Sequence, residues 1–348
     1  MNASAMTNAP TTIDHFVGAR EIKERVRVAI EATWNSGNGC VFPHTLALGS
    51  PGLGKTELSR IIAREMGCEL VETLGQSIRT TAELYATLLM AEGGCVLIDE
   101  AHALSGDIQV SLLKVLQEGM IFLPQAGCSD RIKPIQLKPL CLIAATTDEW
   151  ALARPLVERF RLLLRFDFYG IEDLTTLVAR RARSASIVLD NGVAEQIAQR
   201  AKGTPRLGIR LLDACCRTMQ AEATGTVSLA TFERTCQLEQ IDSLGLDMVE
   251  QRYLHLLGEA GGRQRVNVIA SCLGLPRQTL ERAIEPFLIR ARLVEKTEQG
   301  RILTAIGRQH LNSGMGQTSP IPKRRDFETP TPSASMKADV PEGEHPCQ

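Results

Sequence analysis

Residues 49–56 are Gly49-Ser50-Pro51-Gly52-Leu53-Gly54-Lys55-Thr56, which fits the pattern of a phosphate-binding loop: Gly, four residues, then Gly-Lys-Ser/Thr. Glycines such as Gly52 and Gly54 allow backbone N–H groups to close around phosphate oxygens. Lys55 can reach the β- and γ-phosphates, and the Thr56 hydroxyl can hold Mg²⁺. The loop therefore predicts a nucleotide with Mg²⁺ as ligand, and a Gly-rich turn that arose by chance is the alternative.

The residues on either side of the loop favour the nucleotide interpretation. His44 to Leu48 predicts a short buried strand. Glu57 to Met66 predicts a helix whose N-terminal dipole points at the phosphates. A strand, a Gly-rich loop and a helix in this order are the context that the motif requires.

The composition limits what the rest of the chain can be. Its 348 residues suggest two or three domains, and 44% of them are hydrophobic, so sizeable cores are expected. The net charge of -1 gives no global attraction to nucleic acid, so any basic patch must be local. The ten cysteines include no C-x-x-C pair, and we interpret most of them as reduced core residues of a cytoplasmic protein. We expect neither a signal peptide nor a membrane-spanning segment.

A second apolar strand ends in two carboxylates. Cys95-Val96-Leu97-Ile98 is followed directly by Asp99 and Glu100. At a strand tip beside the phosphate loop, Asp99 can hold Mg²⁺ through water and Glu100 can orient the attacking water. The alternative is that the two acids cap the next helix. That alternative does not explain the long apolar run before them, so the catalytic interpretation is favoured.

Two weaker signals follow along the chain. Cys141 to Ala145 predicts another buried strand, and Thr147 just beyond it is a candidate sensor of the γ-phosphate. Arg159, between Glu158 and Phe160, is a candidate arginine finger. An Arg at a helix end is usually a solvated charge, which is the alternative for this residue.

The segment 170–243 shows helical patterns only. Four helices are predicted, at Ile171–Ala185, Asn191–Lys202, Pro205–Ala223 and Ser228–Leu238. Pro205 suits a helix start, where its missing N–H costs nothing. Arg206 in that first turn is either a surface charge or a lid arginine that touches the γ-phosphate.

Residues 244–311 predict a third unit. Helical patterns at Met248–Gly258, Arg265–Leu273 and Arg277–Ala291 precede two short strands that flank the turn Glu298-Gln299-Gly300. Three helices and a hairpin are the layout of a winged helix. Ten Lys and Arg against seven Asp and Glu give this unit a charge of about +3. Residues 1–12 and 312–348 are expected to be disordered.

Together these motifs resemble the RuvB family, the AAA+ motor of Holliday-junction branch migration, over roughly residues 13–311. The lid and third-unit segments are the ones specific to this family. The phosphate loop, Ile98-Asp99-Glu100-Ala101-His102 and Ala145-Thr146-Thr147 recur throughout AAA+ proteins. The resemblance implies an α/β fold with an AAA+ P-loop parallel-sheet core at 13–169, a helical lid domain at 170–243 and a C-terminal winged-helix domain at 244–311. The segments that carry it are the phosphate loop, Ile98-Asp99-Glu100-Ala101-His102, Ala145-Thr146-Thr147, Arg159-Phe160, Phe168-Tyr169, Gly203-Thr204-Pro205-Arg206 and Gly245-Leu246-Asp247.

The resemblance also implies roles for individual residues. Tyr169 would pack near the nucleotide, and Arg206 would be the lid sensor. Arg159 would reach the ATP of a neighbouring subunit, which implies a homo-oligomeric ring, typically a hexamer. The basic DNA contacts of the family fall at Arg277, Lys296 and Arg301. The implied activity is ATP-dependent branch migration of four-way DNA junctions in recombination and repair, with a RuvA-like partner.

Four segments depart from the family pattern, and one of them is the helix from Asp107 to Gln117, whose sequence is more typical of AAA+ proteins in general than of RuvB. Ala9-Pro10 keeps only the Pro of an Arg-Pro pair that helps hold the nucleotide. Lys296-Thr297-Glu298-Gln299 places an acid where the family carries a base, and residues 120–137 differ from the hairpin that docks RuvA. Two alternative functions therefore stay open. One is a remodelling or clamp-loader-like AAA+ ATPase that acts on a protein, and the other is a DNA-binding regulatory ATPase that does not translocate.

Overall fold

The computed structural model describes residues 11–37, 41–91, 93–125 and 128–314. Residues 1–10 and 315–348, most of the two segments expected to be disordered, lie outside the described residues, as does Ala9-Pro10. Residues 312–314 do not begin a disordered tail, because helix α14 (Ala305–Gly314) continues through them. This last helix was not predicted from the sequence.

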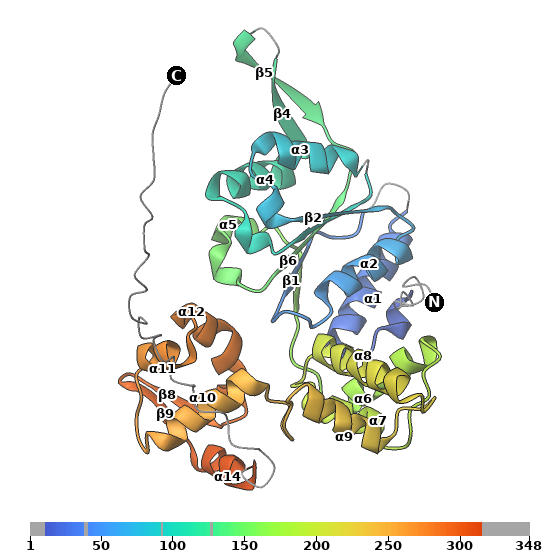
Figure 1. The fold of residues 1–348 in the computed structure, drawn as a ribbon. Helices are drawn as coiled ribbons and strands as arrows, with labels where there is room; N and C mark the ends of the chain where they lie inside the picture. Colours follow the sequence, from blue (N-terminus) through green and yellow to red (C-terminus); the bar gives the residue numbers. More distant parts are fainter. Residues whose placement is uncertain (1–10, 38–40, 92, 126–127, 315–348) are drawn as a thin grey trace, which may run out of the picture.

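The phosphate-loop domain is built on a five-stranded parallel sheet (Figure 1). The strand order is β2-β3-β6-β1-β7, so the loop after β1 opens beside the carboxyl end of β6, and β3 ends next to it. Ligands of open parallel sheets bind at this edge. The strands are β1 (Thr45–Leu48), β2 (Leu70–Leu74), β3 (Cys95–Asp99), β6 (Cys141–Thr146) and β7 (Leu162–Arg165). The four-residue strand β7 was not predicted.

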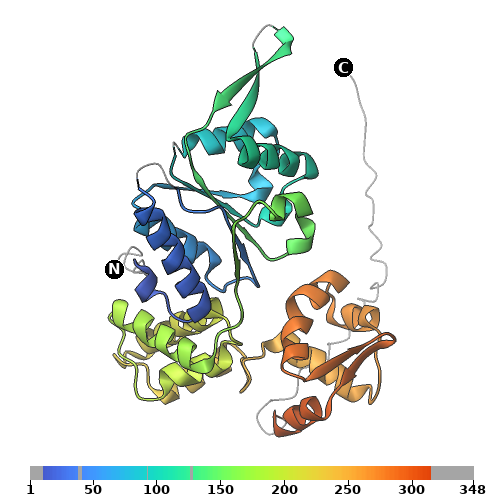
Figure 2. The same ribbon diagram turned by 180° about the vertical axis from the view of Figure 1, so that it is seen from behind.

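Helices cover both faces of this sheet (Figures 1 and 2). Successive residues of a strand point to opposite faces. Leu46 and Leu142 therefore join a core with α3 (Thr81–Met90), α4 (Gly106–Glu118) and α5 (Arg154–Val157). Ala47 and Ile143 join a second core with α1 (Arg20–Asn35) and α2 (Lys55–Glu65). Burial on both faces explains why these strands are almost continuously apolar.

A hairpin extends from the sheet domain at the top of Figure 1. Its strands are β4 (Met120–Gln125) and β5 (Cys128–Gln136), which pair in antiparallel fashion. It occupies the segment where the family resemblance places a hairpin, although the sequence there differs.

The lid contains four helices, as the sequence predicts. They are α6 (Ile171–Ser184), α7 (Val193–Arg200), α8 (Pro205–Glu222) and α9 (Leu229–Leu238). Val178, Ile197, Leu212 and Phe232 are fully or almost fully buried in its core. Pro205 is the first residue of α8, where the missing N–H leaves no bond unmade.

The third unit contains α10 (Met248–Glu259), α11 (Val266–Leu273), a two-stranded wing of β8 (Val294–Thr297) and β9 (Gly300–Leu303), and α14. The helix expected from Arg277 to Ala291 is instead broken into α12 (Arg277–Thr279), the π-helical turn η6 (Leu280–Ile284) and α13 (Glu285–Arg290). Pro286 accounts for the break. It has no N–H for the carbonyl of Arg282, and its ring would clash with that group in α-helical register. A wider turn before the proline removes the clash.

Candidate nucleotide site

The phosphate loop depends on glycine backbone conformations. Gly52 has φ +78° and Gly54 has φ +99°, both in the left-handed region that favours glycine. A Cβ on Gly52 would lie 2.7 Å from the Cβ of Arg206. The loop is therefore packed directly against the first turn of α8 in the lid.

Lys55 is held with its charge toward the loop. Its side chain is buried, and its Nζ donates to the carbonyl oxygens of Gly49 at 2.7 Å and Ser50 at 3.0 Å. Burial lowers the pKa of Lys55, whereas the carboxylates of Glu100 and Asp99 oppose that shift. A buried ammonium that is paired with loop carbonyl oxygens can exchange those partners for phosphate oxygens. This arrangement fits a nucleoside triphosphate.

Thr56 and Asp99 meet where β3 ends beside the loop. The Thr56 hydroxyl donates to the Asp99 carboxylate across 2.7 Å. A hydroxyl and a carboxylate in this position suit a hard cation such as Mg²⁺. Within the described ranges, no group of three or more His, Cys, Asp or Glu side chains could bind a metal alone. A metal here would take its remaining ligands from phosphate and water.

Glu100 is turned toward the end of β6. Its backbone has φ +52°, a left-handed conformation that costs a non-glycine residue on the order of 1 kcal/mol or more. Its Oε2 lies 3.4 Å from the Thr147 hydroxyl and 3.2 Å from His102 Nδ1. The Glu100 carbonyl packs on Gly75, where a Cβ would lie only 2.5 Å away. The structure thus brings Thr147 to the predicted water-orienting acid.

His102 contacts both this carboxylate and the Thr146 hydroxyl through its Nδ1 atom. The Thr146 hydroxyl donates its one proton to the Asp148 carbonyl at 3.1 Å. The same hydroxyl lies 3.1 Å from His102 Nδ1. The same ring nitrogen faces the Glu100 carboxylate. The sequence motif includes His102 but did not reveal this role.

Two aromatic side chains, Tyr169 and Phe16, pack against the phosphate loop. The Tyr169 hydroxyl donates to the Leu53 carbonyl at 3.1 Å, and burial raises its pKa. A Cβ on Gly18 would lie 2.5 Å from the Tyr169 ring, and a Cβ on Gly54 would lie 3.1 Å from the Phe16 ring. Tyr169 therefore packs on the phosphate loop, and its contact with a nucleotide stays a prediction. Phe16 and Gly18 were missed, because no local pattern marks a contact between segments so far apart.

The two predicted arginines lie in different places. The backbone N–H of Arg206 donates to the Gly52 carbonyl at 3.3 Å, and its charge adds to the lowering of the Lys55 pKa. Arg159 is exposed just after α5. With the Gln117 amide oxygen turned toward it, Arg159 donates to that oxygen at 2.7 and 3.2 Å. Across the described residues, no hydrogen bond or ion pair joins Arg159 to the phosphate loop of its own chain.

The predicted DNA contacts do not form one exposed group. Arg277 is exposed and pairs with Glu281 at 3.1 Å, and Lys296 is exposed on β8. Arg301 is 5% exposed and binds Glu285 at 2.9 Å and Glu281 at 3.1 Å. The expectation that Arg301 contacts DNA is therefore corrected: its guanidinium lies inside the domain and is neutralised there.

We expect Arg301→Ala to destabilise the winged-helix unit by about 3–5 kcal/mol, because the carboxylate of Glu285 would be left buried without its cation. Glu285 is 2% exposed and also accepts from the Tyr253 hydroxyl at 2.9 Å. Urea unfolding would measure the loss. Lys296→Ala is the control, since Lys296 is the cross-strand neighbour of Arg301 but is exposed. An unchanged unfolding free energy for Arg301→Ala would contradict a structural role.

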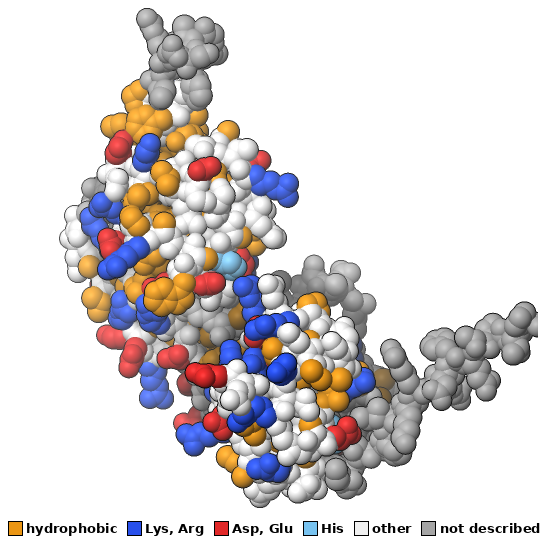
Figure 3. Space-filling model, turned by 90° about the vertical axis from the view of Figure 1, so that its left-hand side faces the viewer, with side chains coloured by type: hydrophobic (Ala, Val, Ile, Leu, Met, Phe, Trp, Pro, Cys, Tyr) orange, Lys and Arg blue, Asp and Glu red, His pale blue; other side chains and the backbone are white. Residues whose placement is uncertain are grey.

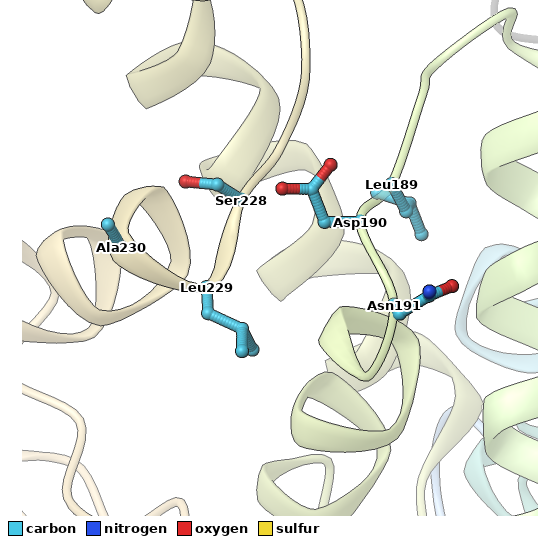
Figure 4. Close-up of a pocket in the computed structure, with 6 residues that line it drawn as sticks. All are labelled: Leu189, Asp190, Asn191, Ser228, Leu229 and Ala230. Atoms are coloured by element: carbon cyan, nitrogen blue, oxygen red, sulfur yellow. The ribbon is translucent and has the colours of Figure 1, made fainter.

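A shallow hollow in the lid does not belong to the nucleotide site (Figure 4). Its lining residues are Leu189, Asp190, Asn191, Ser228, Leu229 and Ala230, from the segments that precede α7 and begin α9. None of them is a predicted functional residue. A second hollow, by contrast, is lined by Thr56 and Asp99 together with Arg60 and Glu72.

Comparison with known proteins assigns the family. Three family models match successive segments: the Holliday junction DNA helicase RuvB P-loop domain over residues 9–166, the RuvB AAA lid domain over 169–242 and the RuvB C-terminal winged helix domain over 243–312. The Holliday junction branch migration complex subunit RuvB of Rubrobacter xylanophilus is 35% identical over 309 residues, which make up 88% of this chain and 86% of that protein. The chain belongs to the RuvB family.

Solved structures of RuvB share the fold. The Thermotoga maritima RuvB Holliday junction branch migration motor matches with a TM-score of 0.76 at 30% identity, over 87% of this chain and 98% of that one. A variant of the same protein matches with a TM-score of 0.77. The sheet, lid and winged helix are thus those of RuvB, and the phosphate loop is that of a nucleotide-binding RuvB domain. In the described ranges, no helix is both long and apolar enough to cross a membrane.

Proposed function

We propose that this protein is the ATP-hydrolysing motor of a Holliday-junction branch-migration complex in the cytoplasm. The observation that carries the proposal is the set of Lys55, Thr56, Asp99 and Glu100 assembled at one edge of the sheet in a RuvB framework. The names of the relatives, which describe a branch migration motor and a branch migration complex subunit, support the same reaction.

The geometry suggests how the chain would hydrolyse ATP. Lys55 would bind the β- and γ-phosphates, and Thr56 and Asp99 would hold Mg²⁺, which neutralises phosphate charge when bound. Glu100 would orient the attacking water while His102 and Thr147 fix its carboxylate. Through their contacts with the phosphate loop, Tyr169 and Arg206 would couple nucleotide binding to the position of the lid.

The position of Arg159 supports a ring. An exposed arginine that lies away from its own phosphate loop can reach the pocket of a neighbouring copy. We propose a homo-oligomeric ring, with six subunits as the family expectation. The hairpin of β4 and β5 is the proposed docking point for a RuvA-like partner.

The winged-helix unit is the proposed DNA contact. In Figure 3 it faces the viewer in the lower part, where Lys and Arg side chains outnumber Asp and Glu. Lys296 and Arg277 would touch the phosphate backbone, which carries little base information. Glu298, in the two-residue turn between β8 and β9, would repel it.

We expect Glu298→Arg to tighten binding to duplex and four-way-junction DNA and to steepen its salt dependence, by about 0.9 in log–log slope for each additional phosphate that the protein neutralises. Lys296→Ala should weaken binding equally at every sequence. Affinities measured between low and physiological salt would test this. Glu259→Gln, an exposed acid on α10, is the matched control. If neither substitution moves the affinity or the slope, this face does not hold DNA.

One observation favours a protein-directed alternative. Arg301 is buried and Arg277 is paired with Glu281, so of the three expected contacts only Lys296 has no ion-pair partner among the described residues. Winged helices can also bind proteins, and a remodelling ATPase would then be the better description.

ATP turnover, with and without four-way-junction DNA, separates the two functions. A branch-migration motor is expected to be stimulated by the junction, and Lys55→Ala should abolish turnover in both conditions, because the loop then lacks its cation. Turnover that is indifferent to DNA would favour the remodeller. Binding of DNA without turnover would favour a regulatory role. Chelation of Mg²⁺ by EDTA should stop the reaction.

A further inference from the structure

One arginine of the winged-helix unit touches two segments that lead into the lid. Arg290, at the end of α13, stacks on the Phe168 ring with its guanidinium carbon 3.2 Å from the ring centroid. Its Nη2 also donates to the Lys202 carbonyl. Phe168 lies in the connection from β7 to α6, and Lys202 lies in the loop between α7 and α8. Arg290 therefore bridges both segments from a different domain.

Lys202 makes a second connection to the same unit. Its side chain is 11% exposed and forms an ion pair with Glu250 of α10, which is 5% exposed. Its Nζ also lies 5.1 Å from the centroid of the Phe287 ring. The Lys202 backbone has φ +53°, a conformation that a non-glycine residue keeps only when its surroundings enforce it. The buried pair with Glu250 is part of those surroundings.

The bridged segments lead straight to the phosphate loop. The Tyr169 N–H donates to the Gly203 carbonyl at 2.9 Å, which holds the two segments side by side. From one segment, the Tyr169 hydroxyl reaches the Leu53 carbonyl. From the other, the Arg206 N–H reaches the Gly52 carbonyl. Phe168 and Lys202, which Arg290 contacts, are thus each close in sequence to a residue that contacts the phosphate loop.

We infer that Arg290 and Lys202 are positioning residues that couple the winged-helix unit to the nucleotide pocket through Tyr169 and Arg206. A planar guanidinium is suited to the task, because it can stack on Phe168 while it donates a hydrogen bond, which an ammonium cannot do equally well. Because such coupling is reciprocal, a ligand that displaces the winged helix changes nucleotide affinity, and a nucleotide changes affinity for that ligand. The inference rests on the proposed ATPase function, with DNA as that ligand.

The test compares Arg290→Ala, Arg290→Lys and the control Arg282→Ala, which removes an exposed arginine in the preceding turn η6. The readouts are affinity for a fluorescent ATP analogue, with and without four-way-junction DNA, and the DNA affinity of each variant. In the parent, we expect DNA to change nucleotide affinity by about fivefold or more. Arg290→Ala should abolish this effect while retaining DNA binding, Arg290→Lys should restore part of it, and Arg282→Ala should match the parent.

A double variant shows whether the stacking itself carries the coupling. Phe168→Leu and Arg290→Ala should each remove it, and together they should remove no more than either alone. If Arg290→Ala keeps the parent response to DNA, the inference is overturned. Because nucleotide affinity is measured without turnover, a parent protein that does not hydrolyse ATP would contradict the proposed function while this test still decides the coupling.

Discussion

Glu100→Gln is expected to keep ATP binding and to lower turnover by about 10²–10⁴-fold, because an amide cannot take a proton from the attacking water as a carboxylate does. The substitution preserves size, so the contacts of Glu100 with the Thr147 hydroxyl and His102 remain geometrically feasible. Binding of a fluorescent ATP analogue and single-turnover hydrolysis, measured on the same preparation, would separate the two effects.

The control for this substitution is Glu118→Gln, which neutralises an exposed acid at the end of α4. It should leave both binding and turnover at the parent values. If Glu100→Gln turned over at the parent rate, another group would have to orient the water. If it lost ATP binding instead, Glu100 would be needed for the shape of the pocket, which its left-handed backbone and its contact with Gly75 make the competing explanation.

The parts of the site that could be predicted from the sequence are those whose residues belong to one short, continuous motif. The phosphate loop places Lys55 and Thr56 within eight residues, and the strand before Asp99 and Glu100 is an uninterrupted apolar run. Such local patterns determine the local backbone, and the parallel sheet then brings the strand ends together. Phe16, Gly18 and Gly75 could not be found in the same way, because each is defined by a contact with a distant segment.

Arg301 shows why a charged residue on a predicted hairpin is hard to interpret. On the sequence it is one cation among several near a turn. In the fold, the side chain of Arg301 points from β9 into the domain, where it binds the acids Glu281 and Glu285. The two acids, Glu281 in η6 and Glu285 at the start of α13, stand four residues apart, a spacing at which like charges repel unless a cation lies between them. Only the tertiary arrangement identifies Arg301 as the partner.

Arg159→Ala is expected to lower ATP turnover by about 10³–10⁵-fold, the usual contribution of an arginine finger that stabilises transition-state charge. The isolated subunit should hydrolyse poorly, and the specific activity of the parent should rise steeply with protein concentration, because the proposed ring must assemble first. Arg154→Ala is the matched control: Arg154 begins the short helix α5 that ends just before Arg159, and its side chain is 91% exposed. It should retain the activity of the parent.

Mixing two inactive variants tests whether the finger acts between subunits. Arg159→Ala subunits keep the pocket, and Lys55→Ala subunits keep the finger. In a head-to-tail ring each interface joins the pocket of one subunit to the finger of the next, so random mixing gives roughly a quarter of the interfaces both intact parts. Activity should therefore return in the mixture, although each variant alone is inactive. Turnover by a monomer that is independent of concentration, or a mixture as inactive as its components, would exclude the arrangement in which Arg159 completes a neighbour's site.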